Sequence, residues 1–151
     1  MPTKIIVLGD SKVGKTSIVS RWTAPFMFPY VDHTIGIDCR SHIHNYADKL
    51  YKLQFWDCSG KKEYLDLFDT YIYNANVAVV VFDVTRSISF RNVDFWIQKV
   101  VKRHGAKFPI CIVANKIDRE SERVIHKEDI KTFVDSLDYN IIVMETSATH
   151  N

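Results

Sequence analysis

Short apolar runs, separated by segments of helical period, dominate the hydrophobic pattern of this chain. Three runs rich in Val and Ile cover Lys4 to Leu8, Val77 to Val84 and Ile110 to Ala114, and a weaker fourth covers Ile141 to Met144. They are too short for globular helices, so the pattern favours buried strands of a parallel sheet.

Helical spacing appears between these runs. Apolar residues recur at helical positions from Phe90 to Val101, after Ser87 or Ser89 as a candidate N-cap, and again from Ile130 to Leu137. Strands alternating with helices predict an α/β sandwich.

Two further segments look extended. Residues 36–44 and 50–57 are joined by a turn-like stretch at 45–48, which predicts a hairpin and one antiparallel edge strand. The expected sheet is therefore mostly parallel and six-stranded, in a three-layer fold. No repeat or linker interrupts residues 1–151, so a single domain is predicted.

Composition excludes several classes of function. A net charge of +2 over 151 residues is too small for a nucleic-acid footprint, and the basic cluster Lys102-Arg103-His104 is interpreted as a solvated face. Three cysteines without metal-ligand spacing favour a reduced, cytoplasmic protein. No apolar stretch reaches membrane-spanning length and the last four residues carry no prenylation signal, so no membrane anchor is expected in this chain. A lipidated tail beyond these residues would make the protein membrane-associated.

A phosphate-binding loop follows the first predicted strand. Gly9 to Thr16, G-D-S-K-V-G-K-T, matches the P-loop pattern in full, and its backbone N–H groups can form an anion nest at a helix N-terminus. Lys15 can reach the β- and γ-phosphates, and the Thr16 hydroxyl can ligate Mg²⁺. A glycine-containing turn without a ligand is the alternative. The predicted phosphate contacts are Ser11, Lys12, Val13, Gly14, Lys15, Thr16 and Ser17.

A later motif selects the base. Asn115-Lys116-Ile117-Asp118 follows the third apolar run and resembles the N-K-x-D motif of the small-GTPase superfamily. A carboxylate such as Asp118 can accept from both N1–H and the 2-amino group of guanine, which adenine does not offer side by side. The resemblance implies that Asn115 braces the loop and that the Lys116 stem lies across the base. An ATP-using P-loop enzyme, the alternative, is disfavoured by Asp118.

The resemblance extends to three other segments. Ser147 and Ala148 look like the family's S-A loop, which implies a backbone N–H from Ala148 to the guanine oxygen. Asp57-Cys58-Ser59-Gly60 is similar to D-x-x-G, which implies that Asp57 holds Mg²⁺ and that Gly60 contacts the γ-phosphate. Thr34 would add a hydroxyl to Mg²⁺. These motifs together imply GTP or GDP with Mg²⁺ as the bound ligands.

Four stretches resemble the Rab branch of this superfamily. They are Thr34 to Asp38, Lys52 to Trp56, Tyr71 to Ala75 and Phe82 to Thr85. The resemblance implies a GTP-hydrolysing molecular switch in vesicle traffic. Effector and regulator proteins would bind residues 30–44 and 60–73, which include the two switch segments.

The chain also departs from the family. Lys61 stands where the family places the Gln that orients the attacking water, so slow GTP hydrolysis is predicted. A GTP-binding interaction module that does not hydrolyse GTP is the alternative. Lys12 replaces a small P-loop residue, and Phe28 is the candidate aromatic against guanine. The candidate catalytic residues are Lys15, Thr34, Gly60 and Lys61. The family's C-terminal helix is missing, so one sheet face is expected to be poorly covered.

Overall fold

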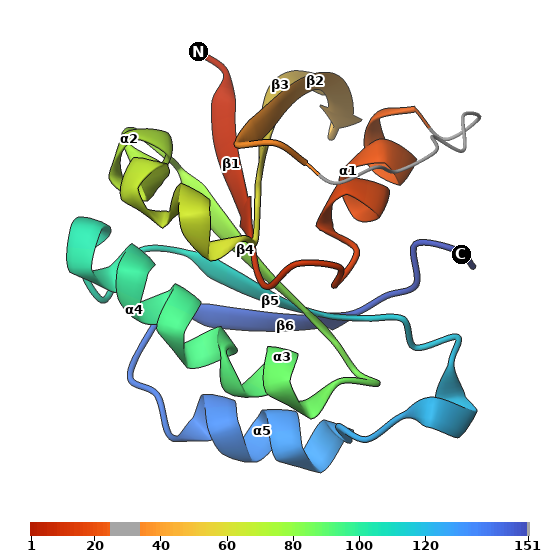
Figure 1. The fold of residues 1–151 in the computed structure, drawn as a ribbon. Coiled ribbons are helices and arrows are strands. Elements are labelled where there is room, and N and C mark those ends of the chain that lie inside the picture. Colours follow the sequence, from red (N-terminus) through yellow and green to blue (C-terminus); the bar gives the residue numbers. More distant parts are fainter. Residues whose placement is uncertain (25–33, 151) are drawn as a thin grey trace.

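The predicted six-stranded sheet forms the centre of the molecule in a computed structural model that describes residues 1–24 and 34–150 (Figure 1). The strand order is β2-β3-β1-β4-β5-β6. β2 runs antiparallel to β3, and every other pair is parallel. The predicted α/β fold with one antiparallel edge strand is therefore confirmed. The strands are β1 Thr3–Leu8, β2 Ile37–Tyr46, β3 Lys49–Cys58, β4 Val77–Asp83, β5 Ile110–Asn115 and β6 Ile141–Glu145.

Helices connect the parallel strands. They are α1 Lys15–Thr23, α2 Phe68–Ile72, α3 Ser87–Arg91, α4 Val93–His104 and α5 Lys127–Asp135, with 3-10 turns η1 Lys62–Leu67 and η2 Glu120–Glu122. The single helix predicted across Phe90 to Val101 is wrong in detail, because α3 and α4 meet at Asn92. The N-cap prediction is also wrong: Arg86 precedes α3, and the Ser89 hydroxyl donates to the Arg86 carbonyl from inside it.

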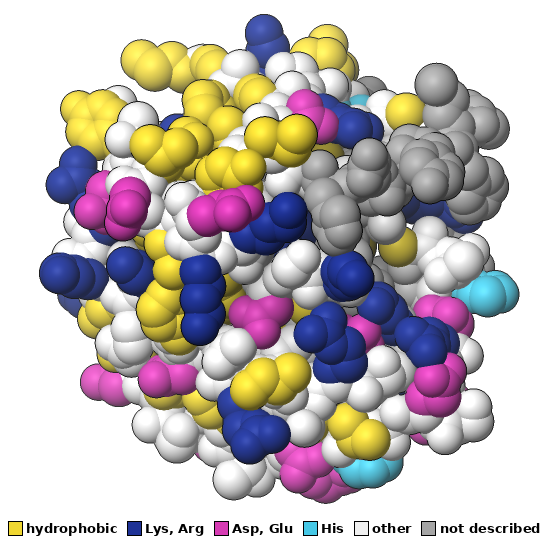
Figure 2. Space-filling view, viewed as in Figure 1, with side chains coloured by type: hydrophobic (Ala, Val, Ile, Leu, Met, Phe, Trp, Pro, Cys, Tyr) yellow, Lys and Arg dark blue, Asp and Glu magenta, His cyan; other side chains and the backbone are white. Residues whose placement is uncertain are grey.

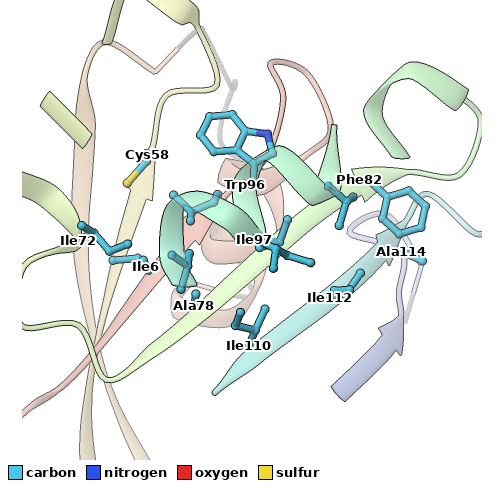
Figure 3. Close-up of a cluster of buried hydrophobic side chains, with 14 of the residues drawn as sticks. Ile6, Cys58, Ile72, Ala78, Phe82, Trp96, Ile97, Ile110, Ile112 and Ala114 are labelled. Carbon is cyan, nitrogen blue, oxygen red and sulfur yellow. The ribbon is translucent and has the colours of Figure 1, made fainter. Parts of the chain in front are cut away.

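One sheet face carries the larger apolar core, beneath α2, α3, α4 and α5. Ala78, Ile110 and Ile112 lie on the strands below Ile97 of α4, and Ile6 lies beside Ile72 of α2 (Figure 3). All of these side chains are buried. Alternation along the strands produces this face, because successive side chains point to opposite sides of a sheet.

The opposite face packs against α1. Val7, Val19 and Val81 are buried there, and the outer strand β6 leaves Ile142 and Met144 62% and 57% exposed. The two cores on either side of the sheet make the three predicted layers. Ile142 and Met144 match the expectation of a poorly covered region. Among the described helices, none is long and apolar enough to cross a membrane.

Candidate functional site

Four loops that carry the sequence motifs meet at the carboxyl edge of the sheet. They follow β1, β3, β5 and β6, and β1 lies centrally between β3 and β4. In open α/β sheets this edge is where ligands bind. A Cβ on Gly60 would lie 2.4 Å from Ser11 N, and one on Gly14 would lie 2.3 Å from Asn115 Nδ2. The loops therefore pack so closely that glycine is required at both positions.

The P-loop holds its lysine inward. The Lys15 ammonium is buried and donates to the carbonyls of Gly9 at 2.9 Å and Asp10 at 2.8 Å. Burial lowers the pKa of Lys15, while Asp57 pulls that pKa upward. Lys12 adopts a left-handed backbone with φ 66°, a region that glycine tolerates best. The loop is thus a preformed cradle that already holds cationic charge.

Sequence reasoning missed the residues that brace this loop. Asp10 accepts hydrogen bonds from Asn92 Nδ2 at 2.7 Å and Trp96 Nε1 at 3.0 Å. The Arg86 guanidinium donates to the Ser11 carbonyl at 3.1 Å. Trp96 lies in α4, Asn92 directly precedes α4, and Arg86 directly precedes α3. All three are more than seventy residues away along the chain, so no local motif could have revealed them.

The three predicted metal ligands converge. Thr16 Oγ1 donates to Asp57 Oδ2, and the Thr16 and Thr34 hydroxyl oxygens lie 2.9 Å apart. Asp57 Oδ1 is buried and has no hydrogen-bond partner among the described residues. Burial raises the pKa of Asp57, although the Thr16 hydroxyl and Lys15 oppose the rise.

This oxygen set fits Mg²⁺. A carboxylate and two hydroxyls are hard oxygen ligands of the type that Mg²⁺ prefers, and a bound cation would satisfy the orphaned Asp57 oxygen. A cation would also reverse the effect of burial on that carboxylate, because it favours the ionised form.

The loop after β5 is tied to the P-loop. Asn115 is buried, and its Nδ2 donates to the Val13 carbonyl at 2.8 Å. Lys116 Nζ donates to the Lys12 carbonyl at 2.9 Å and to Asp83 Oδ2 at 2.6 Å. Both motif residues therefore lie beside the phosphate loop, and they link two segments that are about a hundred residues apart in sequence.

Asp83 is a second residue that sequence reasoning missed. It is fully buried at the end of β4, where Thr85 N and Thr85 Oγ1 also donate to it at 2.9 Å and 2.7 Å. Burial pushes the pKa of Asp83 upward, but the hydrogen bonds from Lys116 and Thr85 outweigh it, so the pKa is held below its ordinary value. Asp83 thereby fixes the ammonium of Lys116. The sequence signal that could have identified Asp83 is an acidic residue within an otherwise apolar run.

The loops after β5 and β6 meet through Asp118. Ser147 Oγ donates to Asp118 Oδ1 at 2.5 Å, and the backbone N–H of Ile117 donates to the Thr146 carbonyl at 3.3 Å. The Asp118 side chain is 17% exposed, and His150 Nδ1 lies 3.8 Å from its Oδ2. Ser147 thus orients the carboxylate that was assigned to guanine, and Ala148 follows directly.

A cavity of about 410 Å³ occupies the phosphate side of these loops. Ser59 lines it without having been predicted. Among the predicted residues, those that line it are Ser11, Lys12, Gly14, Lys15, Thr16, Ser17, Thr34, Gly60, Lys61 and Lys116. The other predicted residues that the structure describes do not line it; they are Val13, Asp57, Asn115, Asp118, Ser147 and Ala148. The Val13 side chain is buried in the core beside α1.

Lys61 lines the cavity, and its Nζ lies 3.9 Å from Glu63 Oε1 in a half-exposed ion pair. Its backbone N–H donates to Ser59 Oγ at 3.3 Å. Phe28, the candidate aromatic for the base, lies outside the described residues.

Comparison with known proteins agrees with this geometry. The model of the Ras family matches residues 4–151. The chain belongs to the Ras family. Its relatives are Rab-like: it is 34% identical over 145 residues to each of the Ras-related proteins RABA1f, RABA1g and RABA1h of Arabidopsis thaliana. Each match covers 96% of this chain and 66% of the relative, so this Ras-family chain spans slightly less than two thirds of their length.

Proposed function

We propose that this Ras-family chain is a Rab-like GTPase domain that binds GTP or GDP with Mg²⁺ and hydrolyses GTP slowly. The observation that carries this proposal is the junction of the four motif loops. Gly60 packs on the P-loop, Asn115 donates to the Val13 carbonyl, and Ser147 donates to Asp118. A phosphate cradle and a guanine acceptor therefore belong to one connected site.

Phosphate binding is assigned to the P-loop. Backbone N–H groups of residues 11–17 would contact the phosphates, with the N-terminus of α1 adding its dipole. The Lys15 ammonium would exchange its two carbonyl contacts for phosphate oxygens, a stronger charge-assisted interaction. Gly60 would contribute a backbone N–H to the γ-phosphate.

The metal is assigned to Thr16, Thr34 and Asp57. Mg²⁺, when bound, would neutralise charge on the β- and γ-phosphates. Asp57 would supply a carboxylate oxygen to the metal, and the Thr16 hydroxyl is already directed at it. Thr34 reaches the group only if its segment lies close, so loss of the γ-phosphate is expected to release that segment.

Guanine selectivity is assigned to Asp118. Its carboxylate would accept two adjacent donors of guanine, and Ser147 holds one of its oxygens in place. The Lys116 stem, fixed by Asp83 and the Lys12 carbonyl, would lie across the base. Ala148 would donate its backbone N–H to the guanine oxygen. Adenine would leave the Asp118 charge unpaired, which disfavours ATP.

The switch role and its partners rest on the Rab-like relationship. Effector and regulator proteins are proposed to contact residues 30–44 and 60–73, of which residues 30–33 lie outside the described part of the chain. Within the described part, Ile35, Ile43 and Leu67 are 80%, 56% and 46% exposed. Exposed apolar side chains of this kind mark interaction surfaces when they cluster. We propose that these contacts serve vesicle traffic at cytoplasmic membrane surfaces.

Slow hydrolysis is proposed because of Lys61. An amide can accept from the attacking water and donate to phosphate at once, whereas an ammonium only donates. Lys61 lines the phosphate cavity, so its charge could stabilise bound GTP without orienting water. The GTP form would then persist.

Single-turnover hydrolysis of preloaded GTP with Mg²⁺ tests this proposal beside Lys61→Gln. We expect the variant to hydrolyse GTP faster, on the order of 10²-fold, the worth of one well-placed polar group in a transition state. Lys62→Gln is the matched control, because Lys62 is exposed and does not line the cavity. It should leave the rate unchanged.

Other outcomes of this experiment would distinguish a slow GTPase from an interaction module that binds GTP without hydrolysing it. GTP binding without hydrolysis in the parent and in both variants would favour the interaction module. A parent rate at or above that of Lys61→Gln would mean that lysine positions the water. Displacement of bound fluorescent GDP by ATP at the same concentration as GTP would overturn the guanine assignment itself.

A further inference from the structure

A hollow of about 520 Å³ lies between α2 and α4 and shares no lining residue with the phosphate cavity. Asp69, Thr70 and Tyr73 form its α2 wall, and Lys99, Lys102 and Arg103 form its α4 wall. Figure 2 shows Lys and Arg side chains gathered on the side of the molecule where Figure 1 places the end of α4 below α2. A hollow of this size is large enough to hold several side chains of a ligand.

The α4 wall carries uncompensated positive charge. Lys99, Lys102 and Arg103 recur at helical spacing on one face, and none has a carboxylate within 4.0 Å in the described part of the chain. The helix dipole favours cations in the last turn, but three neighbouring like charges repel one another. Asp69 supplies one negative charge on the facing wall, which leaves an excess of two positive charges in the lining. Such a concave cationic surface attracts anions.

Aromatic rings hold two of these cations in place. Lys99 Nζ lies 5.7 Å from the centre of the Phe95 ring and 6.0 Å from that of Phe68, and Arg103 lies 5.4 Å from that of Tyr73. Cation–π contacts orient the charged groups without neutralising them. Tyr73 and Phe95 are themselves 56% and 43% exposed, so apolar ring surface adjoins the charges.

We propose that this hollow docks an acidic segment of a partner protein. Glutamate or aspartate side chains of the partner would pair with Lys99, Lys102 and Arg103, and an apolar side chain would pack on Tyr73. Aromatic and arginine side chains are the groups that most often carry the binding energy of protein interfaces. A nucleic acid needs a longer cationic track, and a flat membrane surface does not reach into a hollow.

The α2 wall of the hollow belongs to residues 60–73, so this docking site specifies the chemistry of a partner for the surface assigned above and rests on the proposed function. α2 follows the loop that contains Gly60, so a shift of that loop with nucleotide state would move one wall of the hollow. Partner affinity would then differ between the GDP and GTP forms. Docking itself does not require this coupling and can be measured without nucleotide.

The test uses a short peptide in which glutamates flank a central leucine, titrated into isotopically labelled protein and followed by nuclear magnetic resonance. We expect shift changes at Tyr73, Lys99, Lys102 and Arg103, both with GDP and Mg²⁺ present and without them. The variant Lys99→Glu/Lys102→Glu should weaken binding at least about tenfold by fluorescence anisotropy, because truncated or reversed charge pairs are costly. Lys49→Glu/Lys52→Glu, on the exposed β2–β3 hairpin, is the matched control and should bind as the parent does.

Several results would overturn the proposal. Chemical-shift changes confined to the residues of the phosphate cavity would mean that the peptide binds positive charge non-specifically and not at the hollow. Equal binding of a peptide with glutamine in place of glutamate, or equal loss in the control variant, would remove the charge argument. Absence of localised shifts, with sedimentation on phosphatidylserine vesicles that depends on Lys99, would identify a membrane-facing surface instead.

Discussion

Lys61 and Asp57 show at the scale of single residues how this site balances stability against binding. Both lie where negative phosphate and positive metal are assigned. The Asp57 carboxylate is buried, and one of its oxygens has no partner among the described residues; the Lys61 ammonium lies 3.9 Å from a carboxylate oxygen of Glu63. Strained or unsatisfied groups of this kind are typical of binding sites.

Neutralising Asp57 should stabilise the ligand-free protein. Burial raises the folded pKa of Asp57 above its unfolded value of 3.8, so the folded state holds the proton to higher pH. Stability from the protonated form is lost as pH rises from 3.8 through the folded pKa, and the ionised group is a penalty at neutral pH. We expect Asp57→Asn to raise the melting temperature at pH 7, and to remove the fall in stability across that window, in protein free of metal and nucleotide.

The same variant should lose its response to ligand. Adding GDP with Mg²⁺ stabilises whichever form binds it, so the parent should melt at a higher temperature on addition while Asp57→Asn shows little change. A variant that is less stable than the parent without ligand would show that attraction between Asp57 and Lys15 outweighs the burial of the carboxylate.

At the scale of elements, the turn of the β2–β3 hairpin lowers the stability of the fold. Tyr46 pairs with Lys49, so Ala47 and Asp48 form a two-residue loop, and both have positive φ, at 48° and 60°. Turns of this type prefer Asn-Gly, because other side chains clash in the left-handed region.

Replacing the turn residues should therefore stabilise the fold. We expect Ala47→Asn with Asp48→Gly to raise the free energy of unfolding by about 1 kcal/mol, after the greater unfolded-state entropy of glycine is subtracted. Thermal melting should shift upward by about 2–4 °C. Ala47→Val is the opposing variant and should lower the melting temperature, because a β-branched side chain tolerates positive φ poorly. No difference between the two variants would mean that the hairpin frays before the protein unfolds.

At the scale of the whole molecule, a few hydrogen bonds hold loops from distant parts of the chain together. Asn115 ties the loop after β5 to Val13, and Asp10 is braced by Asn92 and Trp96. Because these groups sit at the carboxyl edge of the sheet, the fold and the site depend on the same contacts.

Asn115→Ala should lower both the stability of the fold and the affinity for GDP. Losing its hydrogen bond leaves the buried Val13 carbonyl unpaired, so we expect chemical denaturation to show about 1–3 kcal/mol less stability. GDP affinity should fall with it. Asn45→Ala is the control, because Asn45 is exposed on β2 and should change neither quantity. A stable variant with normal GDP affinity would mean that water replaces the amide.

The sequence was sufficient for the elements and the motifs because both are local. Apolar runs located β1, β4, β5 and β6 to within about one residue at each end, and the spacing of Gly9, Gly14, Lys15 and Thr16 predicted the loop that α1 continues. The sequence did not reveal the junction of α3 and α4, because the helical spacing of apolar residues continues across Asn92, where α3 ends and α4 begins. Periodicity shows only which side chains face the core. Two short consecutive helices on one face of the sheet therefore produce the same apolar spacing as a single helix.

Sequence by itself thus determined the chemistry available at each loop, since residue type and spacing fix what a phosphate loop, a D-x-x-G turn or an N-K-x-D segment can offer. Tertiary structure alone decided which groups meet. Asp83 reaches Lys116, Asp10 reaches Asn92 and Trp96, and Lys99 shares a hollow with Tyr73, because sheet order and helix packing bring distant segments together. Such contacts join segments that are far apart in sequence and leave no local pattern, so only the folded chain reveals them.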